Sequence, residues 1–339
     1  MRRLPQPKIG VGLVAAALVT AGMSSPAFAA AEKDEFAEES SSGSAQPSDD
    51  AMVSVADEEG DRRDLLPSGG RLLLTGGVST IEGAGGGGLV PWALIGGYGT
   101  RDELGINAYV TGVDTKDFTL ASYGAAINVR NRLELSVARQ NFNLREVGNV
   151  LALGNRYTIS QTIIGAKVRL FGDAVLEQDS LVPQVAAGVQ YKVNDDEGVV
   201  GGALGLDRKS VDFYLSATKV ILSKSLLLNA TVRLTKANQF GILGFGGLGG
   251  QDQDYKAQFE GSAAYLLTRK LAVGGEYRTK SNRLEGALGG TSFREEDAWD
   301  VFAAYALNRN VSLTVAYARL GQIALRRQDG AYASIQIGF

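Results

Sequence analysis

Apolar and polar residues alternate along the chain from Gly69 to Phe339, and this alternation limits the possible folds more than any other feature of the sequence. In the last stretch, 331–339, every second residue is Ala, Ile or Phe, whereas the residues between them are Tyr, Ser, Gln and Gly. A repeat of two residues is that of a β-strand with one apolar face, and no helical repeat is sustained in this region. The alternation therefore predicts an all-β fold.

The connections between the expected strands alternate in length. Short polar turns lie at 100–104, 129–133, 222–226, 267–271 and 307–311, and longer, mostly glycine-rich connections lie at 82–88, 146–155, 194–210, 238–254, 281–297 and 321–329. This pattern is typical of transmembrane antiparallel β-barrels, which have short periplasmic turns and long external loops. A soluble β-sandwich is the alternative, but the apolar faces here continue to the strand ends, as strands in lipid require.

The number of strands follows from these connections. We expect about fourteen, beginning near Arg71 and ending at Phe339, and an even number is typical of bacterial barrels. Twelve strands is the alternative, because the glycine-rich stretch Gly83–Gly88 could equally be an insert in the lumen.

The first 68 residues differ from the rest of the chain. Residues 1–29 have the marks of a signal peptide: Arg2 and Arg3 form a basic start, residues 9–21 are apolar, and an Ala-x-Ala site predicts cleavage after Ala29. Residues 30–64 hold twelve acidic and three basic side chains. Such a composition cannot offset the entropy of folding by burial, so we expect 30–68 to be a disordered acidic linker and 69–339 to form the barrel.

The carboxy-terminal residues resemble the signal that the outer-membrane barrel assembly machinery reads. The chain ends on Phe339, apolar residues alternate back from it, and Tyr332, Ile335, Ile337 and Phe339 are expected to carry the signal. The resemblance implies a protein of the outer membrane of a Gram-negative bacterium, with membrane lipid and the assembly machinery as its partners.

The stretch from Glu82 to Arg101 has the sequence EGAGGGGLVPWALIGGYGTR. It resembles a proteobacterial family of porin-like outer-membrane β-barrels whose function is unassigned. The resemblance extends over roughly 69–339 and leaves the acidic linker out. Because this family supplies no catalytic residues, the resemblance implies a fold and a location and leaves the activity open.

The composition excludes several kinds of chemistry. The chain has no His and no Cys, so Ser-His-Asp triads, Cys-His dyads, disulfides and His- or thiolate-bound metals are excluded. The stretch Gly83–Gly88 lacks the Gly-Lys-Ser/Thr ending of a phosphate-binding loop. A formal net charge of −3 at pH 7 gives no reason to expect a nucleic-acid partner. We therefore expect neither an enzyme nor a cofactor or metal site.

Strand alternation also assigns charged side chains to the lumen. The residues expected there are Glu134, Lys167, Arg169, Lys192, Arg233, Glu260, Glu276, Arg278 and Asp300. In a wide pore such charges set the ion selectivity, whereas in a narrow or plugged barrel they pair with one another. The sequence leaves both possibilities open.

A passive, porin-like channel for small solutes is the function that this pattern favours. The stretches 201–206, 241–249 and 286–290 are unusually apolar for exposed loops, so a carrier or receptor for apolar molecules is the second possibility. The third is a structural barrel that anchors an envelope partner through its acidic linker. No pattern in the sequence identifies the solute.

Overall fold

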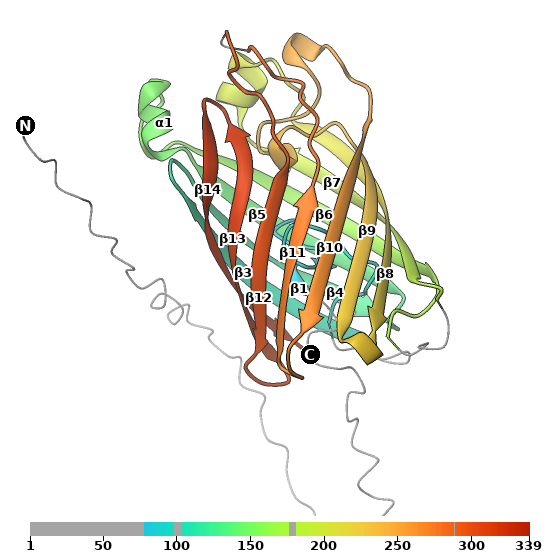
Figure 1. Ribbon diagram of the computed structural model, residues 1–339. Coiled ribbons are helices and arrows are strands. Elements are labelled where there is room, and N and C mark those ends of the chain that lie inside the picture. The colour runs from blue at the N-terminus through green and yellow to red at the C-terminus, as the bar shows by residue number, and fades with distance from the viewer. Residues whose placement is uncertain (1–77, 98–103, 176–180, 288) are drawn as a thin grey trace, which may run out of the picture. The chain divides into compact units, whose positions relative to one another are not determined.

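Twelve antiparallel strands form a closed barrel in the computed structural model (Figure 1). The structure describes residues 78–97, 104–175, 181–287 and 289–339. The strands of the barrel are β3 (Leu104–Thr115), β4 (Thr119–Val129), β5 (Leu133–Asn143), β6 (Thr158–Phe171), β7 (Gln184–Asn194), β8 (Lys209–Ile221), β9 (Leu226–Thr235), β10 (Lys256–Leu266), β11 (Leu271–Arg278), β12 (Ala298–Ala306), β13 (Val311–Ile323) and β14 (Arg326–Gly338). Consecutive strands pair, and β14 closes the barrel by pairing with β3, so the sheet has no free edge.

The structure confirms the alternative count of twelve strands rather than the expected fourteen. The described part of the segment assigned to the first two strands, residues 78–97, lies inside the barrel and contains only β1 (Val78–Ser79) and β2 (Gly85–Gly86). These two pair with each other as a separate small sheet. The glycine-rich stretch is therefore an insert in the lumen and not an external loop.

The burial of side chains follows the predicted alternation, with the apolar face on the outside. Along β3, Ile106 and Val110 are 50% and 46% exposed, whereas Asn107 and Thr111 are 2% and 1% exposed. Exposed aromatic side chains lie toward strand ends at Tyr191, Phe213, Tyr255, Tyr277 and Tyr305. An apolar exterior around a polar interior is the pattern of strands surrounded by lipid. The fold is thus an all-β transmembrane barrel.

The two ends of the barrel differ. At the end where the chain terminates, short turns such as the 3-10 turn η2 (Leu222–Lys224) join most strands, and the connection between β6 and β7 is longer. The opposite end carries longer loops, which contain α1 (Arg145–Val150), the π-helical turn η1 (Glu197–Ala203), and the 3-10 turns η3 (Gln239–Gly241) and η4 (Leu248–Gly250). The prediction of a long loop at 321–329 is wrong, because β13 and β14 extend through most of it and leave only residues 324–325 between them.

The predicted signal peptide (1–29) and acidic linker (30–68) lie outside the described residues. None of the helices within the described ranges is long and apolar enough to cross a membrane.

Candidate functional site

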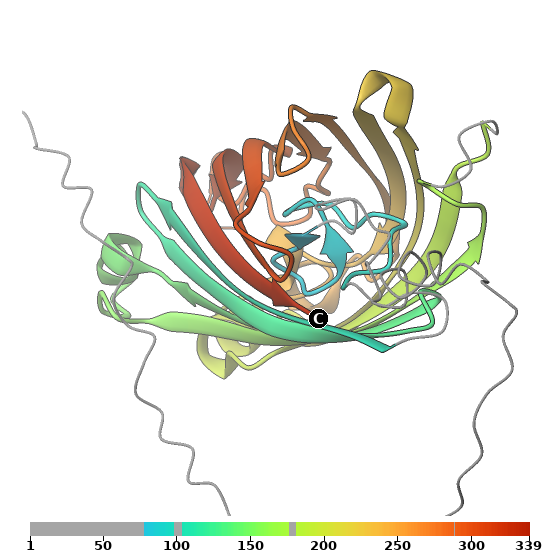
Figure 2. The ribbon, with the colours of Figure 1, turned by 90° about the horizontal axis from the view of Figure 1, so that it is seen from below.

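Residues 78–97, which we call the plug segment, occupy the lumen of the barrel. Seen along the barrel in Figure 2, this segment lies within the ring of strands. Every one of its residues is buried. Its glycines let the backbone approach the barrel wall closely: a β-carbon on Gly87 would overlap the carboxylate of Glu276, and one on Gly88 would overlap the phenol oxygen of Tyr332. Gly88 also has a φ of 148°, which L side chains rarely adopt.

Polar side chains of the wall satisfy the backbone of the plug segment. The carbonyl of Ile81 accepts hydrogen bonds from Ser122 Oγ at 2.7 Å and from Gln140 Nε2 at 2.6 Å. On β7, two strands along the wall from Gln140, Gln184 Nε2 donates to the Ala93 carbonyl at 2.6 Å. Buried backbone groups that lack a partner are costly, and a segment with little secondary structure cannot supply its own partners. The polar wall therefore holds the segment in one position.

One ion pair of the wall contacts the plug segment both in its middle and near its carboxy-terminal end. Lys167 and Glu134 lie 3.1 Å apart and are fully buried. The Glu134 carboxylate accepts the N–H groups of Gly85 at 3.0 Å and Gly96 at 2.7 Å, and the Lys167 ammonium donates to the carbonyl of Leu94 at 2.6 Å. The pair thus stabilises the fold of the plug segment as well as its place in the lumen.

Glu82 is the only charged side chain in the plug segment, and it meets three buried cations. These are Lys192 on β7, Arg233 on β9 and Arg278 on β11, which we call the cation cluster. Glu82 forms an ion pair with each, at 2.8 Å for Arg278, at 3.4 Å for Arg233, and at hydrogen-bonding contact for Lys192. A carboxylate among three desolvated cations forms strong charge-assisted hydrogen bonds, and its removal leaves the cations without full compensation.

Two acidic residues of the wall share the cation cluster with Glu82. Asp212 on β8 lies 2.8 Å from Lys192, and Glu260 on β10 lies 2.5 Å from Arg233 and 3.1 Å from Arg278. The wall therefore contributes three positive and two negative charges within ion-pair distance, and Glu82 supplies the third negative charge. Only with the plug segment in place is this group of six side chains neutral.

A second acidic site faces the glycine run. Glu276 and Asp300 are opposite each other in the register of β11 and β12. The Glu276 carboxylate accepts from the N–H of Leu89 at 2.7 Å and from the Ser262 hydroxyl at 2.8 Å. The plug segment thus presents N–H groups to the acidic part of the wall and a carboxylate to the basic part.

The loops at the far end of the barrel close over the plug segment. Apolar side chains of these loops and of the adjoining strand ends form a buried cluster, made of Phe118, Phe142, Leu144, Val147, Ile159, Val200, Leu204, Leu206, Ile242, Leu243, Leu284, Phe293, Ile323 and Ala324. We call this cluster, together with Phe240 of η3, the cap, because Phe240 lines the same cavity as Phe118 and Phe142. Phe118 and Phe142 stack with their ring centroids 4.9 Å apart. The Gly/Leu-rich stretches at 201–206 and 241–249 therefore bury apolar side chains against one another across the mouth of the barrel.

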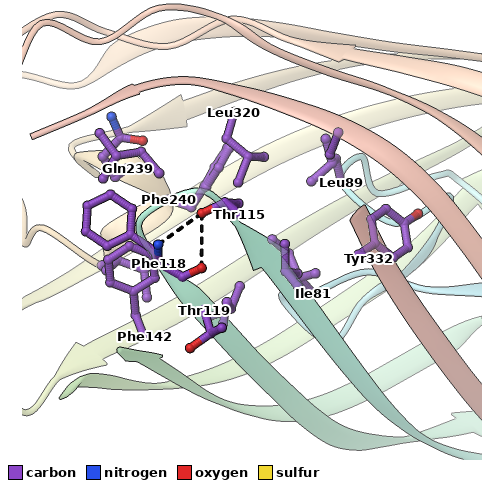
Figure 3. Close-up of a pocket in the computed structure, with 15 residues that line it drawn as sticks. Ile81, Leu89, Thr115, Phe118, Thr119, Phe142, Gln239, Phe240, Leu320 and Tyr332 are labelled. Atoms are coloured by element: carbon purple, nitrogen blue, oxygen red, sulfur yellow. Dashed lines mark hydrogen bonds between the residues drawn. The ribbon is translucent and has the colours of Figure 1, made fainter. Parts of the chain in front are cut away.

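A small apolar cavity separates the cap from the plug segment (Figure 3). Its walls include Ile81 and Leu89 of the plug segment and Phe118, Phe142 and Phe240 on the side of the cap. At about 40 Å³ it is far smaller than the ~300–1,000 Å³ of typical small-molecule sites. A solute can occupy this space only if the cap or the plug segment moves.

Two members of the cation cluster also bind the cap. The Lys192 ammonium donates to the carbonyl of Phe240 at 3.2 Å, and the Arg278 guanidinium lies 4.4 Å from the centroid of the Phe240 ring. Both cations simultaneously contact Glu82. The two barriers in the lumen are thus joined through the same pair of side chains.

The structure places the nine charged residues predicted for the lumen on the inner face of the barrel. Eight of them are buried, namely Glu134, Lys167, Lys192, Arg233, Glu260, Glu276, Arg278 and Asp300. Arg169 lies nearer the short-turn end and pairs with Asp173 at 3.2 Å. Glu82 and Asp212 were not among the charged residues predicted for the lumen. The alternation of Val211, Phe213 and Leu215 with the polar face of β8 could have assigned Asp212, whereas nothing in the sequence pairs Glu82 with the wall.

The residues of the predicted assembly signal lie on both faces of β14. Ile335, Ile337 and Phe339 are exposed on the outside, whereas Tyr332 is buried and lines the cavity (Figure 3). Their role in assembly stays a prediction. Within the described ranges, no group of three or more His, Cys, Asp or Glu side chains is arranged to hold a metal ion.

Comparison with known proteins identifies the family. The model of a family described as protein of unknown function, DUF3034, matches residues 75–336. The chain belongs to this family. The predicted resemblance to an outer-membrane β-barrel family of unassigned function is therefore confirmed. The match covers the plug segment together with the barrel. No curated protein matches the chain.

Several solved outer-membrane barrels are similar in structure at low sequence identity. The KdgM porin is 11% identical, with 69% of this chain and 99% of that chain covered and a TM-score of 0.43. Omp33 from Acinetobacter baumannii is 8% identical, covering 71% and 100% of the two chains with a TM-score of 0.38. Outer membrane phospholipase A from Escherichia coli is 9% identical, covering 68% and 92% with a TM-score of 0.38.

Proposed function

We propose that this protein is a gated channel for small solutes in the bacterial outer membrane. In this proposal the short-turn end faces the periplasm and the cap faces outwards, as is usual for outer-membrane barrels. The plug segment is the gate. The expected passive channel is closed at rest in this proposal, because the plug segment and the cap both block the lumen.

The observation that carries the proposal is the match between the plug segment and a polar wall. Without the segment, the inner face would be lined by charged side chains such as Glu134, Lys167 and Glu276, together with Ser, Thr and Gln residues. Such a lining suits a water-filled path, since an unhydrated and unpaired charge is costly. The plug segment also contributes apolar side chains, among them Trp92 and Leu94, to a buried cluster with wall residues such as Phe302. Its other contacts are hydrogen bonds and ion pairs, which water can replace when the segment leaves.

Conductance in planar bilayers tests the gate. We expect the full chain to be closed most of the time, the Glu82→Gln variant to open more often, and a variant lacking 78–97 to conduct persistently. Heat-modifiable migration in gels checks that each variant is a folded barrel. Folded variants that carry no more current than the full chain would contradict the proposal.

A carrier for apolar molecules is the second candidate. It is favoured by the apolar cavity between the plug segment and the cap, which lies on the path through the lumen. Saturable uptake of an apolar solute into liposomes, without ion conductance in any variant, would support the carrier over the channel.

A further inference from the structure

We infer that the cation cluster of Lys192, Arg233 and Arg278 is a binding site for the carboxylate group of a solute, and that Glu82 occupies this site when the channel is closed. This inference rests on the gated channel proposed above and names its solute class, small anionic solutes with a carboxylate. The first step is the charge balance. Removing the plug segment leaves the wall with three cations and two carboxylates in contact, an excess of one positive charge.

The second step is the geometry of the site. Arg278 and Lys192 address different oxygens of the Glu82 carboxylate, Oε2 and Oε1, and Arg233 approaches Oε2 from a third strand. Arginine side chains present planar sets of N–H donors that suit a carboxylate better than a spherical anion. The three cations come from strands of the rigid barrel, so the site persists when the plug segment moves.

The third step concerns how a solute could open the gate. Releasing Glu82 into water without a substitute exposes the positive excess in a confined lumen, which is unfavourable. A solute carboxylate restores neutrality and binds only when Glu82 has left, so it shifts the population toward the open state. Because Lys192 and Arg278 also bind Phe240 of the cap, exchange of the carboxylate acts on both barriers.

The matching probe is propionate, because the glutamate side chain beyond Cα is a propionate group. The chain contains two tryptophans, and one of them, Trp92, is buried in the plug segment and donates to Ser262 Oγ at 2.9 Å. In a Trp299→Phe background, Trp92 fluorescence reports the position of the plug segment alone. Sodium propionate should shift the emission to longer wavelength in a saturable manner, whereas the neutral isostere propionamide at equal concentration should not.

Calorimetry on detergent-purified Glu82→Gln protein tests the site without its internal competitor. This variant should bind propionate more tightly than the full chain with Glu82 intact. Adding Arg278→Gln should weaken propionate binding roughly tenfold or more, as loss of one charge-assisted contact predicts. The control is Arg208→Gln, since Arg208 lies in an external loop and pairs with Glu197. Adding this substitution to Glu82→Gln should leave propionate binding unchanged. Equal responses to propionate and propionamide, or no effect of Arg278→Gln, would overturn the inference.

Reversal potentials separate this inference from the gated channel itself. In a KCl gradient the Glu82→Gln channel should prefer chloride over potassium, and propionate should reduce its chloride current. A conducting Glu82→Gln channel that prefers potassium overturns the carboxylate site and leaves the gate standing. Propionate binding without current in any folded variant overturns the channel and leaves the site standing.

Discussion

At the scale of single residues, glycine determines how tightly the plug segment fits. Gly88 combines a positive φ with close contact to the Tyr332 phenol, whereas Gly154 in an external loop has a φ of 88° and no atom within 4 Å of where a β-carbon would be. An L residue would therefore be strained by the positive φ at either position, but only at Gly88 would its β-carbon also overlap another atom.

We predict that Gly88→Ala loosens the plug segment more than strain alone explains. An L residue at a positive φ lowers the free energy of unfolding by about 1–3 kcal/mol. Gly154→Ala should show only this loss, with the emission of Trp92 unchanged. Gly88→Ala should shift the emission of Trp92 to longer wavelength, and Tyr332→Phe in the same chain should partly reverse the shift by removing the overlapping oxygen. An unchanged emission in Gly88→Ala would show that the contact does not hold the plug segment.

We predict that Glu295 makes the cap sensitive to pH. It lies in the loop between β11 and β12, and its carboxylate accepts the N–H of Gln239 at 3.1 Å. Burial raises the pKa of Glu295 to about 7, against the attraction of Lys280, Arg283 and Arg278. Lys280, whose pKa burial lowers to about 8, stays charged below that pH.

The sign of the pH effect follows from the raised pKa. The carboxyl of Glu295 binds its proton more tightly in the closed loop than in the opened loop. Protonation of Glu295 therefore stabilises the closed loop fully below about pH 4.5, and this stabilisation is lost as the pH rises through about 7. Exchange of the Gln239 amide, corrected for the intrinsic rate, should therefore accelerate across this range, and Glu295→Gln should abolish the acceleration. Exchange that slows over the same range would contradict this assignment.

At the scale of elements, alternation predicted the strands well because it depends only on which face of each strand meets lipid. The strand β14 lies where the period-two pattern of 331–339 placed it, and β5 and β9 begin at the last residues of the short turns predicted at 129–133 and 222–226. Alternation failed at 78–97, since a glycine-rich segment with short apolar stretches reads equally as two strands joined by a loop. It failed again at 321–329, where β13 and β14 continue past an irregularity between Arg319 and Gly321.

The site was less predictable than the strands. Alternation assigned Lys192, Arg233 and Arg278 to the lumen, but their common partner Glu82 precedes them in sequence by more than a hundred residues and belongs to no strand of the barrel. Pairing of this kind depends on how a segment packs inside a closed wall, which no local pattern encodes. The cap was likewise anticipated only as a set of unusually apolar loops.

Shortening the long loop between β9 and β10 should open the cap and leave the plug segment in place. Replacing 239–250 by a short Gly/Ser turn removes Phe240 and Ile242 from the cap, and with Phe240 one apolar neighbour of the cluster that contains Trp92. The hydrogen bonds of the plug segment to the strands remain. We expect faster proteolysis of the remaining external loops with Trp92 emission nearly unchanged. A fully exposed Trp92 would show instead that the cap holds the plug segment in place.

At the scale of the whole molecule, lipid replaces a second protein layer around the sheet. Val137 on β5 is 48% exposed on the outer face, and Leu267 lies in a short turn at one end of the barrel. Arginine on the lipid face near the bilayer midplane costs about 2–4 kcal/mol and close to the interface about 0–1 kcal/mol. Val137→Arg should therefore lower the unfolding free energy in vesicles much more than Leu267→Arg, as denaturant titration measures, and equal effects would contradict a lipid-facing belt.

The most direct test of the gate is a reversible covalent lock between the plug segment and the wall. A β-carbon on Gly83 would lie 3.0 Å from that of Ala138 on β5, so a shift of about 0.5 Å brings a Gly83→Cys/Ala138→Cys pair into disulfide range. The chain has no other cysteine, and the reduced form of the same molecule is the control for any strain at Gly83. We predict that single channels of this variant open when reduced and stay closed when oxidised, with reduction restoring the current. An oxidised form that carries as much current as the open, reduced form would show that solutes pass with the plug segment in place.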